Sequence, residues 1–124
     1  MTEPVIYFEG YKIIEYNYKY NSEEREKSGK GLEVQTALTE DLKKGKVTLV
    51  LTYKEKNVDV SITMDGFFQI RQDINNPKEI TNYLKINGSA MLYPYLRSAL
   101  SMLTSLDSDK AVLLPTLNMN NLSE

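Results

Sequence analysis

The sequence contains no cysteine and no histidine. Without cysteine, the chain can form no disulfide, no thiolate metal site and no cysteine nucleophile. Without histidine, it lacks the commonest general base and the commonest zinc ligand, and a Ser-His-Asp arrangement is impossible. Carboxylates alone can still perform acid–base chemistry, so these absences restrict catalysis without excluding it. We predict a protein that is not an enzyme, with no catalytic residues, no metal and no cofactor.

Long apolar runs and a strong charge of one sign are also missing. No run approaches the roughly 20 apolar residues that span a bilayer. The N-terminus lacks the basic region and apolar stretch of a secretory signal. We therefore expect no membrane insertion and a cytoplasmic location. The net charge is −2, and lysine and arginine are scattered rather than clustered, so nucleic-acid binding is not expected.

The remaining composition is that of an ordinary globular protein. A chain of 124 residues with 41% hydrophobic and 26% charged residues predicts a single domain over residues 1–124. Nine tyrosines accompany three phenylalanines and no tryptophan. Tyrosine combines apolar area with a polar tip and suits surfaces that are alternately wet and buried. Strand propensity is the simpler explanation, and both remain open.

Alternating apolar and polar residues predict four strands, at residues 5–20, 32–38, 47–53 and 58–71. We expect a bulge at Gly10 in the first strand and an interruption at Gly66 in the last. The charged, glycine-bearing segment 21–31 is predicted to be an exposed crossover loop. Short turns join the last three strands, which predicts an antiparallel meander.

A helix is predicted to begin after Asn76, with Asn76 as cap, Pro77 at the first position and Glu79 completing a capping box. Apolar residues then recur at spacings of three and four as far as Leu106. Pro94 should kink this helix, and the alternative is two helices broken near Gly88. The predicted fold class is α+β: a four-stranded antiparallel sheet followed by a long kinked helix packed on one face.

Two short motifs occur in and after this helix. The first reads Leu92-Tyr93-Pro94-Tyr95-Leu96-Arg97, and the second reads Leu113-Leu114-Pro115-Thr116-Leu117-Asn118-Met119. Together with the order of the elements, they resemble the SecB family of protein-export chaperones. Members carry Leu-Phe-Pro-Tyr-x-Arg in the main helix, followed by Leu-x-Pro-x-Asn-Phe. Tyr93 and Met119 stand where the family usually has phenylalanine.

The resemblance implies a SecB-like fold, a homotetramer built as a dimer of dimers, and unfolded clients bound in apolar grooves. Two departures affect what it implies. The sequence ends five residues after Met119, so the family's second helix is expected to be absent or reduced to a turn. We likewise expect the tail with which members contact the export ATPase SecA to be absent. We therefore do not expect contact with SecA by that route.

The candidate site residues follow from the helix pattern and the motifs. Methionine and leucine can adapt to many client segments, and the candidate client-binding residues are Met91, Met102, Leu106, Leu113, Leu114, Leu117 and Met119. Ordinary core packing is the alternative for this set. The motif residues with a structural or interface role are Leu92, Tyr93, Pro94, Tyr95, Arg97, Pro115 and Asn118. Arg97 would pair with a carboxylate across a subunit interface or be solvated.

The sequence therefore predicts an ATP-independent chaperone, or holdase, that binds unfolded or partly folded polypeptides and self-associates to a dimer or tetramer. Protein export is one process in which the resemblance would place it. One alternative is a protein dedicated to a single partner, such as the chaperone of a toxin–antitoxin system. The other is a structural module whose groove is filled. Because fold alone does not determine function, this step depends on the resemblance.

Overall fold

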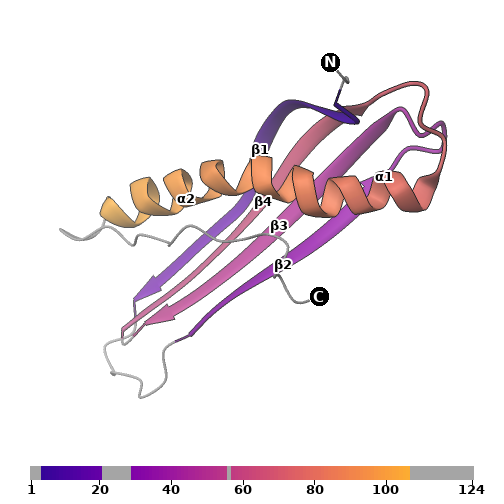
Figure 1. Ribbon diagram of the computed structural model, residues 1–124. Coiled ribbons are helices and arrows are strands. Elements are labelled where there is room, and N and C mark those ends of the chain that lie inside the picture. The colour runs from indigo at the N-terminus through magenta and orange to yellow at the C-terminus, as the bar shows by residue number, and fades with distance from the viewer. Residues whose placement is uncertain (1–3, 21–28, 56, 107–124) are drawn as a thin grey trace.

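The computed structural model describes residues 4–20, 29–55 and 57–106. Its four strands are β1 (Ile6–Tyr20), β2 (Gly29–Leu38), β3 (Lys44–Glu55) and β4 (Val58–Ile70). They form one antiparallel sheet in the order β1-β4-β3-β2 (Figure 1). β1 and β2 are consecutive in the chain but lie at opposite edges, so their connection is the predicted crossover. β2, β3 and β4 form the predicted meander.

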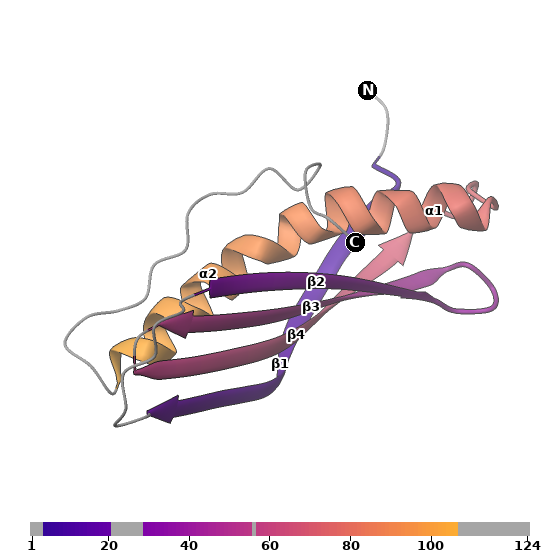
Figure 2. The same cartoon turned by 90° about the horizontal axis from the view of Figure 1, so that it is seen from below.

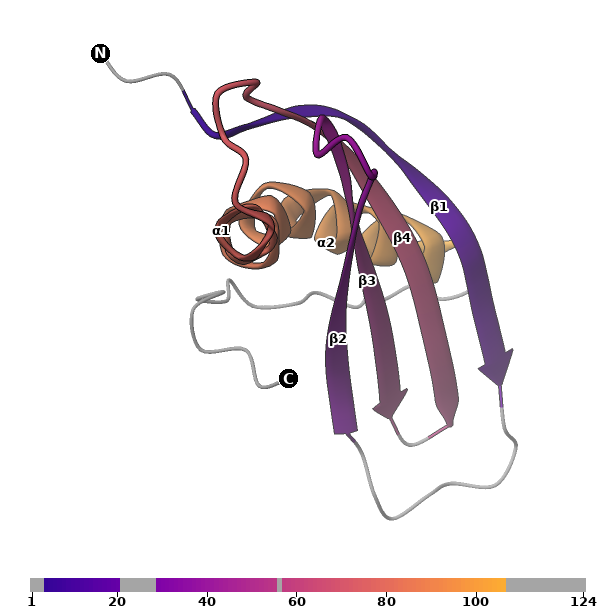
Figure 3. The ribbon, with the colours of Figure 1, turned by 90° about the vertical axis from the view of Figure 1, so that its right-hand side faces the viewer.

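One face of the sheet is apolar because apolar residues alternate with polar ones along each strand. The residues of the two central strands that are buried on this face are Val47, Leu49, Leu51, Val60, Ile62, Met64, Phe68 and Ile70. The helical segment lies diagonally over this face and on one side of the sheet only (Figures 1 and 3). The predicted α+β fold is therefore confirmed.

The helical segment is continuous and consists of α1 (Pro77–Tyr83), a π-helical turn η1 (Leu84–Gly88) and α2 (Ser89–Ser105). Asn76 caps it as predicted, because its side chain accepts hydrogen bonds from the amides of Lys78 and Glu79 at 3.0 and 3.3 Å. α2 continues through Pro94 to its end. Near Gly88 the helix widens into η1 instead of breaking, so the single-helix alternative is the correct one.

Glycines allow η1 to approach the sheet closely. A Cβ atom on Gly45 of β3 would lie 2.6 Å from Leu84 Cδ1, and one on Gly88 would lie 2.9 Å from Val47 Cγ2. Neither distance is possible for a real side chain without movement of its neighbours. The absence of these two Cβ atoms therefore sets the separation of helix and sheet at this end of the molecule.

Two predictions about glycine-bearing segments are wrong. Gly66 does not interrupt β4, because it pairs with Tyr11 on one side and Val47 on the other. A Cβ there would lie 3.0 Å from Leu92 Cδ2, so glycine makes room for α2. The segment Gly29 to Gly31 belongs to β2 and not to the crossover loop. Backbone pairing with β3 requires no apolar side chains, which is why the alternation did not reveal it.

β1 is irregular at two points. The predicted bulge at Gly10 is confirmed by a register shift between Phe8 and Gly10, where Gly10 has a φ angle of 148°. A second shift, between Ile13 and Glu15, was not predicted. Bulges bend a strand and increase its twist, and β1 bends along its length (Figure 2).

Candidate functional site

Helix α2 carries two apolar stripes. Leu92, Leu96 and Leu100 lie against the sheet and are fully buried. A second stripe remains accessible to solvent: Met91 is 38% exposed, Tyr95 41% and Met102 66%. Because these three residues are four and seven positions apart, they share one side of the helix. The sheet therefore covers only part of the apolar surface of α2.

Tyr95 shows where the second stripe lies relative to the sheet. Its ring stacks on Phe8 of β1, with centroids 5.4 Å apart and planes at 22°. It also contacts Tyr11 at a centroid distance of 4.8 Å. Phe8 in turn contacts the buried Phe68 at 5.4 Å. A chain of aromatic rings thus leads from the core to solvent, and the exposed stripe lies on the β1 side of α2.

β1 contributes further apolar area on that side. Tyr11 pairs with Gly66 and Ile13 with Met64, and both partners are buried beneath the helix. Tyr11 and Ile13 are nevertheless 46% and 40% exposed. We define the β1–α2 surface as the five exposed residues Tyr11, Ile13, Met91, Tyr95 and Met102. It combines aromatic, thioether and aliphatic groups, which adapt to partners of varied shape.

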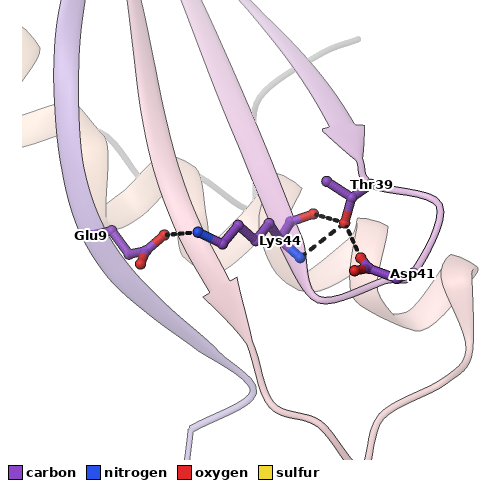
Figure 4. Close-up of polar contacts among 4 residues, drawn as sticks. All are labelled: Glu9, Thr39, Asp41 and Lys44. Atoms are coloured by element: carbon purple, nitrogen blue, oxygen red, sulfur yellow. Dashed lines mark hydrogen bonds and ion pairs between the residues drawn. The ribbon is translucent and has the colours of Figure 1, made fainter.

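The polar groups in and near the turn between β2 and β3 have a structural role (Figure 4). In the turn between β2 and β3, the Thr39 hydroxyl donates to the Asp41 carboxylate at 2.6 Å and accepts from the Lys44 amide at 3.1 Å. The Asp41 carboxylate also accepts a hydrogen bond from the Lys43 amide at 3.0 Å. The bond from Thr39 and, to a smaller extent, the bond from Lys43 hold the pKa of Asp41 below its usual range. The Lys44 ammonium lies 3.9 Å from a Glu9 carboxylate oxygen, an exposed contact worth little in stability.

Two tyrosine hydroxyls also have shifted pKa values. Burial raises the pKa of Tyr93, and the positive charge of Arg97 partly opposes this shift. Burial and a hydrogen bond with Glu55 raise the pKa of Tyr53. Both shifts favour the neutral hydroxyl, so neither tyrosine is activated as a base or nucleophile. Within the part of the chain that the structure describes, no group of three or more acidic side chains could hold a metal ion.

The predicted site residues divide into three groups. Met91, Met102 and Leu106 are exposed on or at the end of α2, as client-binding residues must be. Leu92 and Tyr93 are buried, Arg97 is half-buried, and Pro94 and Tyr95 are exposed. Leu113, Leu114, Pro115, Leu117, Asn118 and Met119 lie outside the described residues. The structure adds Tyr11 and Ile13, which no motif indicated.

Among the described residues, no helix is both long enough and apolar enough to span a membrane. The β1–α2 surface is an exposed apolar surface on an α+β scaffold, built from the edge strand β1 and one side of α2.

Solved structures with a similar fold include a chaperone and a protein of unknown function. The SecB-like chaperone Rv1957 of Mycobacterium tuberculosis, solved in complex with a ChAD peptide from the Rv1956 HigA1 antitoxin, has a TM-score of 0.76 and 14% sequence identity, with 90% of each chain covered. A Streptococcus agalactiae protein of unknown function has a TM-score of 0.60 and 18% identity, covering 90% of this chain and 97% of that one. The chain therefore has a SecB-like fold, as the motifs indicated.

At the level of sequence, none of the protein-family models and none of the curated proteins compared with the chain gives a significant match.

Proposed function

We propose that this protein is an ATP-independent chaperone that binds unfolded or partly folded polypeptides through its β1–α2 surface. The observation that carries the proposal is the second apolar stripe of α2. Met91, Tyr95 and Met102 stay exposed although Leu92, Leu96 and Leu100, beside them on the same helix, are buried. A contiguous exposed apolar surface on a folded domain is typical of a binding site.

The chemistry of the surface suits an unfolded client. Such a client offers apolar side chains in no fixed arrangement, and a rigid pocket would reject most of them. Methionine side chains change shape at little cost, and tyrosine offers an apolar ring with a polar tip. Binding of this kind requires no covalent step, so the proposal includes no enzymatic activity and no cofactor.

We also propose that the protein self-associates to a dimer or tetramer in the cytoplasm. Two observations support this assembly. The fold is SecB-like, and α2 carries apolar residues beyond the β1–α2 surface, with Leu106 at its end 78% exposed.

A second candidate function is the protection of one dedicated partner. The observation that favours it is the Mycobacterium tuberculosis neighbour, which was solved with a peptide from an antitoxin. On the same surface, a dedicated partner would need only one complementary segment, whereas a general holdase must accept many. The two functions therefore differ in the number of clients and not in the site.

The test is suppression of aggregation for two unrelated unfolded proteins at stoichiometric ratios, without nucleotide. Protection of both supports the general holdase. Protection of neither, although an antitoxin-like peptide binds, supports the dedicated partner. If no polypeptide binds and no aggregation is suppressed, the proposed function is wrong.

A further inference from the structure

The π-helical turn η1 holds one residue more than a turn of α-helix. The Ser89 amide donates to the Leu84 carbonyl, five residues earlier, whereas an α-helix pairs each amide with the carbonyl four residues earlier. The extra residue changes the position of every residue that follows it. Without it, α2 would pack on the sheet in a shifted register, in which each residue takes the place of the residue after it.

The phase of the apolar residues shows what η1 changes. The exposed stripe of α2 consists of Met91, Tyr95 and Met102. In an uninterrupted α-helix these residues would lie within about 20° of the side that carries Leu84, because they follow it by 7, 11 and 18 positions. Leu84 is buried against Gly45 of the sheet. The extra residue in η1 is therefore the reason why the stripe assigned to client binding faces solvent.

The shifted register would bury no polar side chain of α2. The residues of α2 that are buried now include two polar ones, Ser89 and Thr104, and the Ser89 hydroxyl has no hydrogen-bond partner among the described residues. The shift would put Gly88 in the place of Ser89 and Leu103 in the place of Thr104. The other buried places would be taken by residues that are also apolar or aromatic: Met91, Leu92, Tyr95 and Ala99.

The shift would also remove the apolar stripe from the β1–α2 surface. The places of its three α2 residues would be taken by the residues before them, which are Ala90, Pro94 and Ser101. These three residues offer a client less apolar area and no aromatic ring or thioether. The observed register thus presents the candidate client-binding stripe, and the shifted register would hide it.

One close contact opposes the shifted register. A Cβ atom on Gly88 would lie 2.9 Å from Val47 Cγ2, a distance that real Cβ atoms do not reach without movement of the neighbour. The shift would bring Asn87, which has a Cβ atom, to this point. Asn87 therefore favours the register in which Gly88 faces Val47 and the stripe of α2 is exposed.

We propose that η1 is a register switch, by which α2 exchanges between the observed register and the shifted one. This inference rests on the proposed function, because it specifies how the client-binding stripe is presented or hidden. A client that contacts the stripe binds only the observed register and shifts the population toward it. Shifts of helix register take microseconds to milliseconds, and this one requires no nucleotide.

Introduced cysteines report the register directly, because the chain has none of its own. Val47→Cys with Gly88→Cys should form a disulfide in the observed register, where the two positions are in contact. Val47→Cys with Asn87→Cys should form one in the shifted register. The matched control is Val47→Cys with Ser89→Cys, since residue 89 lies on the other side of residue 88 and the shift does not bring it to Val47.

The control gives a sharp comparison. In the observed register Ser89 is buried and Asn87 is exposed, so without exchange the Ser89 pair would oxidise at least as fast as the Asn87 pair. With exchange, the Asn87 pair should oxidise about tenfold faster than the Ser89 pair or more, and the Gly88 pair should be the fastest.

The disulfide-locked forms test the consequence for a client. The probe is a fluorescently labelled protein kept unfolded by reduction and alkylation of its cysteines. Oxidation of the Asn87 pair should weaken probe binding about tenfold or more, and reduction should restore it. Oxidation of the Gly88 pair should leave binding unchanged.

A single substitution tests the switch without altering the sheet. Asn87→Gly removes the Cβ atom that opposes the shifted register, so it should weaken probe binding about two- to fivefold. Asn87→Ala keeps that atom and is the matched control, with binding like that of the unchanged protein. Equal binding by the two variants would overturn the switch, also if the cysteine variants fail to fold.

The remaining outcomes are distinct. An Asn87 pair that oxidises no faster than the Ser89 pair would overturn the shifted register. Equal probe binding by the oxidised and reduced Asn87 pair would show that the register does not control the surface, and the inference would be wrong. Fast oxidation of the Asn87 pair, with no probe binding by any form including the unchanged protein, would support the two registers and refute the proposed function itself.

Discussion

Tyr95 of α2 stacks on Phe8 of β1 with ring centroids 5.4 Å apart, while its exposed edge belongs to the surface that we assign to client binding. One side chain therefore contributes both to the attachment of the helix and to the proposed site. Substituting Tyr95 would change stability and binding together. A clean test of the site requires a residue that contributes area and little packing.

Tyr11 suits the test better than Tyr95, because it is 46% exposed and its expected cost to stability is small, and Tyr7 is its matched control. Both are exposed tyrosines of β1, but Tyr11 pairs with the buried Gly66 and Tyr7 with the exposed Gln69. We expect Tyr11→Ser to reduce aggregation suppression about threefold or more, and to lower the free energy of unfolding by about 1 kcal/mol through loss of the Tyr95 contact. Tyr7→Ser should leave suppression unchanged. Equal loss of suppression in both variants would argue against the β1–α2 surface.

Truncation should cost much more stability in the buried stripe of α2 than in the exposed one. Leu100 is fully buried, so Leu100→Ala should lower the free energy of unfolding by about 2–5 kcal/mol. Met102 is 66% exposed, so Met102→Ala should lower it by less than about 1 kcal/mol. Denaturant titration of both variants at equal protein concentration measures the difference. Equal costs would mean that Met102 is buried in the assembled protein and not available to a client.

The fold could be predicted because its signals are local. Asn76 and Pro77 mark the start of the helix by their own chemistry, and the alternation in β3 and β4 is unbroken. The ends of strands were less predictable, since Gly29 and Gly31 join β2 through backbone pairing that leaves no apolar pattern. η1 was not predicted either, and its first residue, Leu84, packs against Gly45 of β3, which is distant in the sequence.

The site was predicted in part, and for a physical reason. Met91 and Met102 fall in the apolar pattern of the helix, but a pattern cannot say which residues the sheet will cover. Tyr11 and Ile13 were missed because the bulges in β1 each shift the alternation by one residue. Beyond a bulge, odd and even positions in the sequence exchange faces of the sheet, so the alternation before the bulge does not show which face a later side chain occupies. Whether the predicted residues bind a client remains a prediction.

Ser89 offers a test of the helix–sheet contact. Its side chain is buried, and the structure gives its hydroxyl no hydrogen-bond partner among the residues described. Burying an unpaired hydroxyl is unfavourable, and alanine is the better helix former. We expect Ser89→Ala to raise the free energy of unfolding by up to about 1 kcal/mol or to leave it unchanged. A loss of more than about 1 kcal/mol in thermal or denaturant unfolding would show that the hydroxyl is satisfied in solution.

The turn between β2 and β3 makes stability depend on pH in a defined direction. The pKa of Asp41 is lowered in the folded state by the hydrogen bonds from Thr39 and Lys43. Ionised Asp41 therefore stabilises the folded state fully at pH values above the pKa of an unfolded aspartate, about 3.9. This stabilisation is lost as the pH falls through the lower pKa that Asp41 has in the folded state. The difference in the midpoint of denaturant unfolding between the unchanged protein and Asp41→Asn should shrink below about pH 4. Glu40→Gln, in the same turn, controls for the loss of a charge; a midpoint difference that grows on acidification would contradict this account.

The central claim is that exposed apolar residues on the β1 side of α2 bind unfolded polypeptide. The most direct measurement is aggregation of two unrelated unfolded proteins, followed with the unchanged protein, Tyr11→Ser and Tyr7→Ser, each with its mass determined by light scattering. The account predicts stoichiometric protection of both clients by the unchanged protein and Tyr7→Ser, and reduced protection by Tyr11→Ser at the same oligomer mass. Absence of protection by the unchanged protein, or protection that Tyr11→Ser leaves intact, would contradict it.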